Sequence, residues 1–263
     1  MNGLTFSSWL TIAALASLHC LGQQRQPEFG KNVSVAEGQE LAREVISQWP
    51  ERNAVFYGFL ISRDGDGKRT KRPLKYSIIV GDEAWQATYE VQPTLSSPGQ
   101  RLAIIHRENQ PNEYLLSPLT NMTSASAQMA RVAAPETFLP FAGSDYWLCD
   151  LGLEFLHWPE QRLIKDAKIT MRSNRACKVL ESINPSPAGN GYARVVSWLD
   201  GESHAPIYAE AYDRQGKLFK VYSLKGFKKV NGRWQPKEME IRNENTDSRT
   251  HLEFQFETEA AQK

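Results

Sequence analysis

The sequence predicts a mainly β protein: a single antiparallel sheet of about eleven strands, preceded by one helix near the N-terminus. Apolar and polar residues alternate in runs that recur roughly every 8–12 residues, which is typical of a meander. Turn pairs such as Asn190-Gly191 and Asp200-Gly201 separate these runs. No linker rich in proline, glycine and serine divides the chain, so one domain is expected.

The composition is that of a globular protein. The 263 residues are 41% hydrophobic and 23% charged, with 31 Lys and Arg against 30 Asp and Glu. This leaves enough apolar material for a core and excludes an acidic disordered chain. A net charge of +1 supplies no long-range field, so we expect no nucleic-acid partner.

Residues 1–22 have the layout of a secretory signal peptide. They contain no Lys, Arg, Asp or Glu and carry an apolar run from Trp9 to Leu18. The run is too short to span a bilayer, and no second run of about 18 apolar residues follows, so we expect an exported, soluble mature protein. Cys20 is either removed with the leader or a lipid-attachment site, although Leu18 and His19 are not the small residues that lipidation requires.

A helix is predicted to begin after Ser34. Ser34 and Glu37 form the pattern of a capping box, and Pro50 ends the element. Apolar side chains at helical spacing give the helix one face that packs on a core: Leu41, Val45, Ile46 and Trp49.

The period of the apolar residues then changes from helical to alternating. Residues 54–61 are apolar throughout and predict a strand buried on both faces. Residues 63–68 (RDGDGK) predict a tight hairpin turn; this acidic loop also resembles a fragment of a calcium site, but the other ligands are missing. Further strands are predicted over 74–80, 85–91, 102–106, 114–116, 162–170, 174–183, 191–199, 205–213, 216–225, 233–243 and 249–256.

Residues 117–158 interrupt this rhythm. Pro118, Pro135 and Pro140 punctuate the segment, and its aromatic and aliphatic side chains do not alternate. We therefore predict short helical or irregular pieces with a large apolar load. A curved sheet has a concave face that must be filled by helices, side chains or a ligand. The sequence leaves open whether this segment encloses an apolar cavity or completes a packed core.

The sequence contains no established catalytic or cofactor-binding motif. The patterns G-x-S-x-G, G-x-x-x-x-G-K-[ST], H-E-x-x-H and C-x-x-C are absent, and the histidines do not lie at metal-ligand spacing. His157, beside Trp158, is interpreted as a core or rim residue, and Glu238 and Glu240 as a solvated strand face. We therefore expect a binding protein, not an enzyme, with no cofactor and no metal site.

Two cysteines follow the predicted leader, Cys149 and Cys177. In an exported protein they can form one disulfide. Two buried thiols are the alternative, because sequence spacing does not define the geometry of the pair.

Four segments carry a family resemblance: FAGSDYWLCDLGLEFLHWPEQRLIK (141–165), RACKVLESINP (175–185), YARVVSWLD (192–200) and residues 206–254. With the leader, the early helix, the meander and the aromatic middle segment, they make the chain resemble the periplasmic LolA/LolB-type lipoprotein carriers. The nearest subgroup is the outer-membrane lipoprotein-sorting proteins. The resemblance covers residues 34–257, which we treat as one LolA-like lipid-binding domain.

The resemblance implies an incomplete, half-open β-barrel of about eleven strands, with helices as a lid over its hydrophobic concave side. It implies a periplasmic carrier that shields the acyl chains of lipoproteins or other envelope lipids during sorting to the outer membrane. The implied partners are those acyl chains and inner- and outer-membrane transfer proteins, and we expect a monomer. An arginine that faces the cavity and holds the lid closed is also implied, but the sequence does not assign it to a position.

We predict that the lipid lies between the sheet and residues 135–158. The candidate contacts from the lid are Phe138, Leu139, Trp147, Leu148, Leu151 and Phe155, and those from the sheet are Trp85, Tyr89, Ile207 and Phe254. The alternative for each is ordinary core packing. Two other functions stay open: a periplasmic sensor of the same fold that binds a membrane-anchored partner protein, and a hydrolase of envelope lipids that uses His157 and His204.

Overall fold

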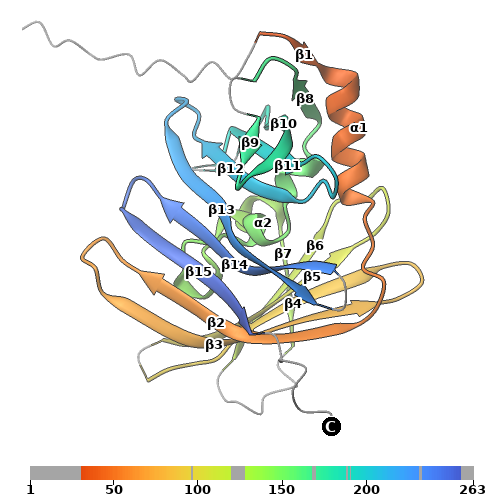
Figure 1. The fold of residues 1–263 in the computed structure, drawn as a ribbon. Helices are drawn as coiled ribbons and strands as arrows, with labels where there is room; N and C mark the ends of the chain where they lie inside the picture. Colours follow the sequence, from red (N-terminus) through yellow and green to blue (C-terminus); the bar gives the residue numbers. More distant parts are fainter. Residues whose placement is uncertain are drawn as a thin grey trace, which may run out of the picture.

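The computed structural model describes residues 31–95, 97–119, 128–167, 170–187, 189, 191–230 and 233–255. The predicted signal peptide and Cys20 lie outside these residues. The described strands form one antiparallel sheet of fifteen strands, which curves into a half-open shell and does not close (Figure 1). The mainly β, half-open class predicted from the sequence is confirmed.

The elements agree closely with the predicted strands. The three strands that the sequence did not predict, β1, β7 and β9, are only two or three residues long, too short to show an alternating pattern. The strands are β1 (Val33–Ser34), β2 (Ala54–Arg63), β3 (Arg69–Val80), β4 (Trp85–Val91), β5 (Gly99–His106), β6 (Glu113–Leu119), β7 (Ala130–Val132), β8 (Glu160–Ile164), β9 (Met171–Arg172), β10 (Arg175–Ile183), β11 (Arg194–Asp200), β12 (Pro206–Tyr212), β13 (Leu218–Val230), β14 (Arg233–Asn243) and β15 (Ser248–Gln255). The helical elements are α1 (Val35–Ile46), η1 (Ala134–Phe138), η2 (Phe141–Gly143), α2 (Leu148–Leu151) and η3 (Glu154–His157).

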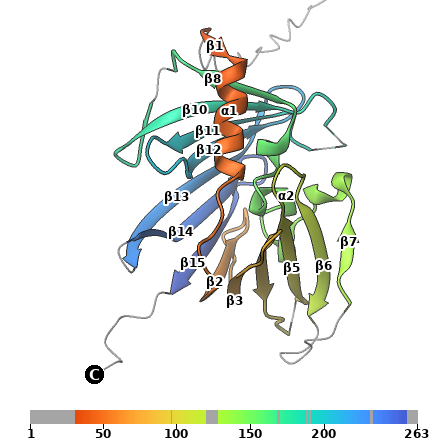
Figure 2. The ribbon, with the colours of Figure 1, turned by 90° about the vertical axis from the view of Figure 1, so that its right-hand side faces the viewer.

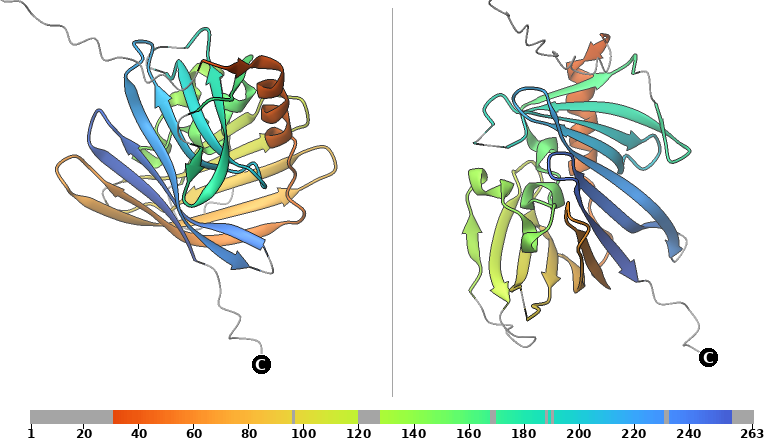
Figure 3. Two further views of the ribbon diagram at one scale, coloured as in Figure 1. Left: turned by 45° about the horizontal axis from the view of Figure 1, so that its top comes forward. Right: turned by 90° about the vertical axis from the view of Figure 1, so that its left-hand side faces the viewer.

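The order of the strands makes the sheet continuous. Strands β2 to β7 form one wing and β8 to β15 the other, and the two wings join where β15 pairs with β2. This pairing places β7 at one edge of the sheet and β8 close to the other, next to β1 (Figure 2). The connection from β7 to β8 must therefore cross from one wing to the other. It does so inside the bend of the sheet, where Figure 3 shows the short helical turns between the wings.

Helix α1 begins as predicted but ends earlier. The Ser34 hydroxyl accepts a hydrogen bond from the Glu37 N–H at 3.4 Å, and the helix ends at Ile46, so Trp49 does not belong to its buried face. Leu41, Ala42 and Val45 are buried, and α1 packs on β8 and η3.

Strand β2 corrects one prediction. Its residues were expected to be buried on both faces, but Val55 and Tyr57 are 52% and 60% exposed, whereas Leu60 is fully buried. Only the concave face of this part of the sheet is covered by other elements. Alternate side chains on the opposite face, which we call the outer face, therefore stay in contact with solvent.

The core consists of clusters on both faces. Cluster 1 lies on the concave face of β2 to β5, β14 and β15 and includes Leu60, Tyr89, Leu102 and Phe254. Cluster 2 lies under α1 and the connection between the wings and includes Leu41, Leu180, Tyr192 and Leu199. Cluster 3 is smaller and lies on the outer face around Val196 and Trp198. None of the helices among the described residues has both the length and the hydrophobicity of a transmembrane span.

The importance of the pairing that joins the two wings can be tested by a substitution at Gly58. A Cβ atom at this position would lie 1.9 Å from the carbonyl oxygen of Glu253, so β15 approaches β2 too closely for any side chain. We expect Gly58→Ala to destabilise the protein by about 1–3 kcal/mol, because backbone must move to relieve the overlap. Urea unfolding measures this loss.

Gly226 provides the matched control. It also lies in a strand, but a Cβ atom there would meet only the Lys237 side chain, at 3.7 Å. Gly226→Ala should leave stability within about 0.5 kcal/mol of the wild type. Equal effects of the two substitutions would show that the close approach of β15 to β2 is not a stability determinant.

Candidate ligand-binding site

Residues 134–158, which we call the cover segment, lie over the concave face of the sheet. The segment is built from short helical turns, as predicted, and two of its turns need a positive φ, at Ala142 and Leu153 (both 50°). It places Phe141, Tyr146 and Leu148 in cluster 1 and Cys149, Phe155 and Leu156 in cluster 2. One crossing thus contributes apolar side chains to both concave clusters.

The predicted contact residues divide between these clusters. Tyr89, Leu148 and Phe254 are buried in cluster 1, with Trp85 and Leu151 packed against it. Phe155 is buried in cluster 2, with Phe138 and Trp147 packed against it. Ile207 is 1% exposed, and strand alternation places it on the same face as Ala209 and Ala211 of cluster 2. Leu139 differs from the others, because it is 49% exposed.

Aromatic rings line the concave face beneath the cover segment. In cluster 1 the rings of Tyr76 and Tyr89 lie 4.6 Å apart and those of Tyr76 and Phe254 5.8 Å apart. In cluster 2 the Trp147 indole stacks on Tyr192 at 4.8 Å, and Phe138 meets it edge-on at 5.6 Å. The contact of Trp147 with Tyr192 joins the cover segment directly to the sheet side of the site.

A buried cation holds the centre of the cover segment. Lys220, on β13, is 1% exposed; its Nζ donates to the carbonyl oxygen of Asp145 at 2.7 Å and lies 3.3 Å from Oδ2 of Asp150. The same ammonium lies 3.5 Å from the centroid of the Trp147 ring. Burial lowers the pKa of Lys220, and the Asp150 carboxylate opposes that shift.

Asp150 organises the polar centre of this site. Its carboxylate accepts the Trp147 N–H at 2.8 Å, which caps α2, and accepts the Tyr192 hydroxyl at 2.9 Å. It thus links the start of α2, the sheet cation and a ring of cluster 2. Removing its charge would leave the Lys220 ammonium buried without an ionised partner.

A second cation holds the other end of the cover segment. Arg72, on β3, is 6% exposed and donates to the carbonyl oxygens of Ala142 and, at 3.3 Å, Pro98. The Ala142 N–H in turn donates to the Gln100 side chain at 2.5 Å. Burial lowers the pKa of Arg72.

Asp145 adds a third attachment, at β15. Its carboxylate accepts hydrogen bonds from Ser248 and, at 2.8 Å, from the Thr250 hydroxyl, which itself accepts the Asp145 N–H at 3.0 Å. The three attachments are all hydrogen bonds or charge contacts. No disulfide bond among the described residues ties the cover segment to the sheet.

The site is closed in this structure. The space between the cover segment and β11 to β14, lined by Leu153, Phe155, Tyr192, Lys220 and Tyr222, amounts to about 30 Å³. That is roughly the volume of one water molecule, so an acyl chain does not fit beside the present side chains.

The cysteines do not form the disulfide considered from the sequence. Both thiols are free: Cys149 is buried in cluster 2, whereas Cys177 packs against cluster 3 on the outer face. Because the sheet lies between the two clusters, the pair is separated by the fold. Burial raises the pKa of both thiols.

The histidines considered from the sequence lie apart from this polar centre. His157 lines a groove of about 330 Å³ between α1 and Trp158, and burial lowers its pKa. His204 lies 3.2 Å from Glu44 on α1. No group of three or more His, Cys, Asp and Glu side chains in the described ranges is placed to hold a metal ion.

Sequence reasoning missed the polar residues that hold the cover segment: Arg72, Asp150, Tyr192 and Lys220. The available signal was a charge inside an apolar alternating run, as in Phe219-Lys220-Val221. The pattern could not show that Lys220 points inward, because a bulge between Ala211 and Tyr212 shifts the register of β12 against β13.

A family model described as "Uncharacterized protein" matches residues 99–261, more than half of the chain. The chain belongs to this family. No curated protein matches the sequence of this chain.

Three solved structures share the architecture. A DUF1329 family protein from Desulfovibrio piger is 16% identical with a TM-score of 0.66, covering 87% of this chain and 95% of the other. A putative outer membrane lipoprotein-sorting protein domain from Vibrio parahaemolyticus is 18% identical with a TM-score of 0.65, covering 88% and 95%. A LolA superfamily protein from Nitrosomonas europaea is 18% identical with a TM-score of 0.53, covering 85% and 92%. At these identities the likeness shows the fold, and the predicted LolA-like fold is confirmed.

The Lys220–Asp150 pair makes a clear stability prediction. Asp150→Asn should cost about 3–5 kcal/mol, because it leaves the Lys220 ammonium buried without a charged partner. Adding Lys220→Met to that variant should recover at least about 1 kcal/mol. Urea unfolding of the single and double variants measures the coupling, and additive effects would contradict a direct interaction.

We also predict how the stability of the protein depends on pH, from His106. Its ring stacks on that of the predicted contact residue Trp85, with 3.8 Å between the ring centroids. Burial lowers its pKa from 6.5 to about 4, although the Asn112 side chain opposes the shift. Between pH 7 and 5 the unfolded chain takes up a proton that the native imidazole does not, so stability falls as the pH falls, by about 2 kcal/mol from this group.

The variant His106→Phe keeps an aromatic ring on Trp85 and cannot titrate. Its loss of stability between pH 7 and 5 should be smaller than that of the wild type by about 2 kcal/mol. Burial also lowers the pKa of His157, so part of the pH dependence should remain. Identical pH profiles of the two proteins in urea unfolding would refute the prediction.

Proposed function

We propose that the protein is a periplasmic carrier that shields the acyl chains of lipoproteins or other envelope lipids on their way to the outer membrane. The observation that carries the proposal is the cover segment, which crosses an aromatic concave face and is held there by side-chain and backbone polar contacts. The shared fold with a putative outer membrane lipoprotein-sorting domain supports it. So do the leader-like residues 1–22.

The proposed ligand takes the place of the cover segment on the concave face. Because the closed site has room for only about 30 Å³, loading requires the segment to move away from the sheet. A chain of about fifteen CH₂ groups gains roughly 12 kcal/mol when it leaves water. That gain offsets the loss of the apolar contacts between Leu148, Phe155 and the sheet.

The polar contacts define where the cover segment must separate from the sheet when it moves away. Two cations of the sheet contact the cover segment in the described part of the chain: Arg72 through Ala142, and Lys220 through Asp145 and Asp150. We assign to Arg72 the role of the arginine that holds the lid closed in the sorting carriers. The aromatic residues of clusters 1 and 2 would form the ligand-facing surface after opening, and no step of this binding reaction needs a cofactor.

A reversible cross-link tests the proposal. The Asp145→Cys, Thr250→Cys variant places two thiols where the cover segment already touches β15. The same variant also carries the substitution Cys177→Ser. Reduced protein should bind a fluorescent fatty acid, and oxidised protein should bind it at least tenfold more weakly, because the segment can no longer leave the sheet.

The single variant Asp145→Cys, treated with the same oxidant, controls for the chemistry and should bind equally in both states. Native mass spectrometry of wild-type protein purified from the periplasm should also detect bound lipid. Equal binding by the locked and open forms, together with lipid-free periplasmic protein, would rule out the proposed carrier.

A further inference from the structure

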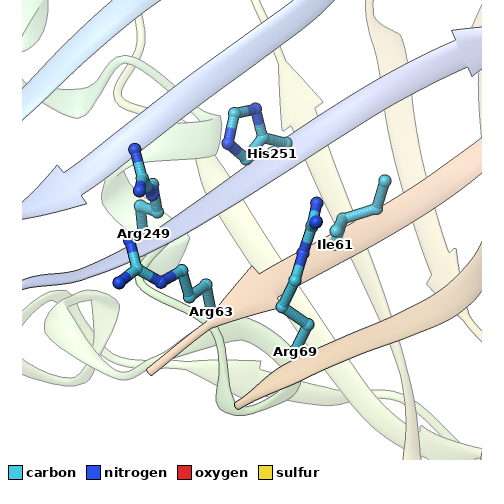
Figure 4. Close-up of a pocket in the computed structure, with 5 residues that line it drawn as sticks. All are labelled: Ile61, Arg63, Arg69, Arg249 and His251. Atoms are coloured by element: carbon cyan, nitrogen blue, oxygen red, sulfur yellow. The ribbon is translucent and has the colours of Figure 1, made fainter. Parts of the chain in front are cut away.

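Three arginines stand in one row across neighbouring strands of the outer face. Arg249 on β15 is directly opposite Arg63 on β2, and Arg63 is directly opposite Arg69 on β3. Their neighbours Thr250 and Ser62 face the concave side, where Thr250 binds Asp145. Alternation therefore directs the arginines to the other face. Figure 4 shows them around a pocket of about 400 Å³ that Ile61 and His251 also line.

None of the three guanidinium groups pairs with a carboxylate or donates a hydrogen bond to another described residue, whereas other charges nearby are matched. Arg242, which extends the row on β14, donates to Glu244 at 2.6 Å. His251 lies between Glu238 and Glu240, at 2.6 and 2.9 Å, and Glu240 also pairs with Lys225 at 2.8 Å. The carboxylates of Glu238, Glu240 and Glu244 are thus already engaged.

This arrangement is unfavourable without an anion. Like charges directly opposite one another in an antiparallel sheet destabilise it. Arg63 and Arg249 are also half-buried, which weakens the screening of their charges by water. Three planar guanidinium groups line one pocket, and arginine donates in pairs to the oxygens of a phosphate group.

We propose that Arg63, Arg69 and Arg249 form a binding site for a phosphate-bearing anion on the outer face of the sheet. The site is separate from the concave face and does not depend on the carrier function proposed above. The phosphate can belong to a soluble ion or to the headgroup of a lipid. Tyr57 and Val55, exposed on the same face of β2, lie about 20 and 27 Å along the strand from Arg63. A lipid surface would engage these apolar side chains together with the arginines, whereas a soluble ion would use the pocket alone.

Two ligands test the site at low ionic strength. Inorganic pyrophosphate is titrated by calorimetry, and vesicles of phosphatidylglycerol are compared with vesicles of phosphatidylcholine by co-sedimentation. The variant Arg63→Gln, Arg249→Gln should bind the phosphate ligand at least tenfold more weakly than the wild type. The double variant Arg52→Gln, Arg214→Gln removes two exposed arginines elsewhere on the surface and should bind within twofold of the wild type.

Thermal unfolding without ligand separates loss of the site from misfolding. The Arg63→Gln, Arg249→Gln variant should melt at the same temperature as the wild type or higher, because it relieves the repulsion in the row. Pyrophosphate should raise the melting temperature of the wild type and of the control variant only.

The two ligands also identify the source of the phosphate. Binding of phosphatidylglycerol vesicles that is weakened by Tyr57→Ser as well as by the arginine variant would identify a lipid headgroup. Pyrophosphate binding that Tyr57→Ser leaves unchanged, without vesicle binding, would identify a soluble ion. The proposal is overturned if the wild type binds neither ligand, or if the control variant loses as much affinity as the pocket variant.

Discussion

The pairing of β15 with β2 is the contact on which the rest of the architecture depends. It joins the two wings of the chain into one sheet and leaves β7 and β8 in different wings. The link between those two strands then has to cross the bend, and the shortest path runs over the concave face. The cover segment is therefore a consequence of strand order. Gly58 permits the pairing, because the β15 backbone occupies the space that a side chain there would need.

The cover segment combines two kinds of interaction with different roles. Phe141, Leu148 and Phe155 supply apolar burial, which is strong and tolerant of small shifts in position. Lys220 and Arg72 supply charge contacts, whose net contribution to stability is small because each cation lost its hydration on burial. The cations instead define the position of the cover segment, because each one contacts a particular part of the segment from a particular strand. In the proposed carrier, these contacts would guide the segment back to the same place after an apolar chain departs.

The two faces of the sheet carry different chemistry because strand alternation sends neighbouring residues to opposite sides. On β15, Thr250, Leu252 and Phe254 serve the concave face, while Arg249 and His251 serve the outer face. One strand thus contributes both to the proposed acyl-chain surface and to the proposed phosphate site. A lipid has both chemical parts, but the sheet separates the two sites, so they would act on different molecules or at different steps.

The local features of this protein could be predicted from its sequence. The Ser34 cap, the 63–68 hairpin turn and the alternating strands follow from interactions between residues that are close in the chain. The tight turn is seen in the hydrogen bond from the Gly67 N–H to the Asp64 carbonyl. The apolar load of residues 135–158 also indicated a cover for the sheet, and the family resemblance indicated the LolA-like fold.

The features that join distant parts of the chain depend on how the strands pair. The exposure of Tyr57, the separation of Cys149 from Cys177 and the contact of Lys220 with Asp150 all depend on which face and which register each strand adopts. The arginine row is the clearest case, since Arg63 and Arg249 come from opposite ends of the sheet-forming chain. Strand pairing is a long-range interaction, and one residue of shift in register would send every side chain to the other face. Local patterns predict that a strand exists, but not which strand will lie beside it.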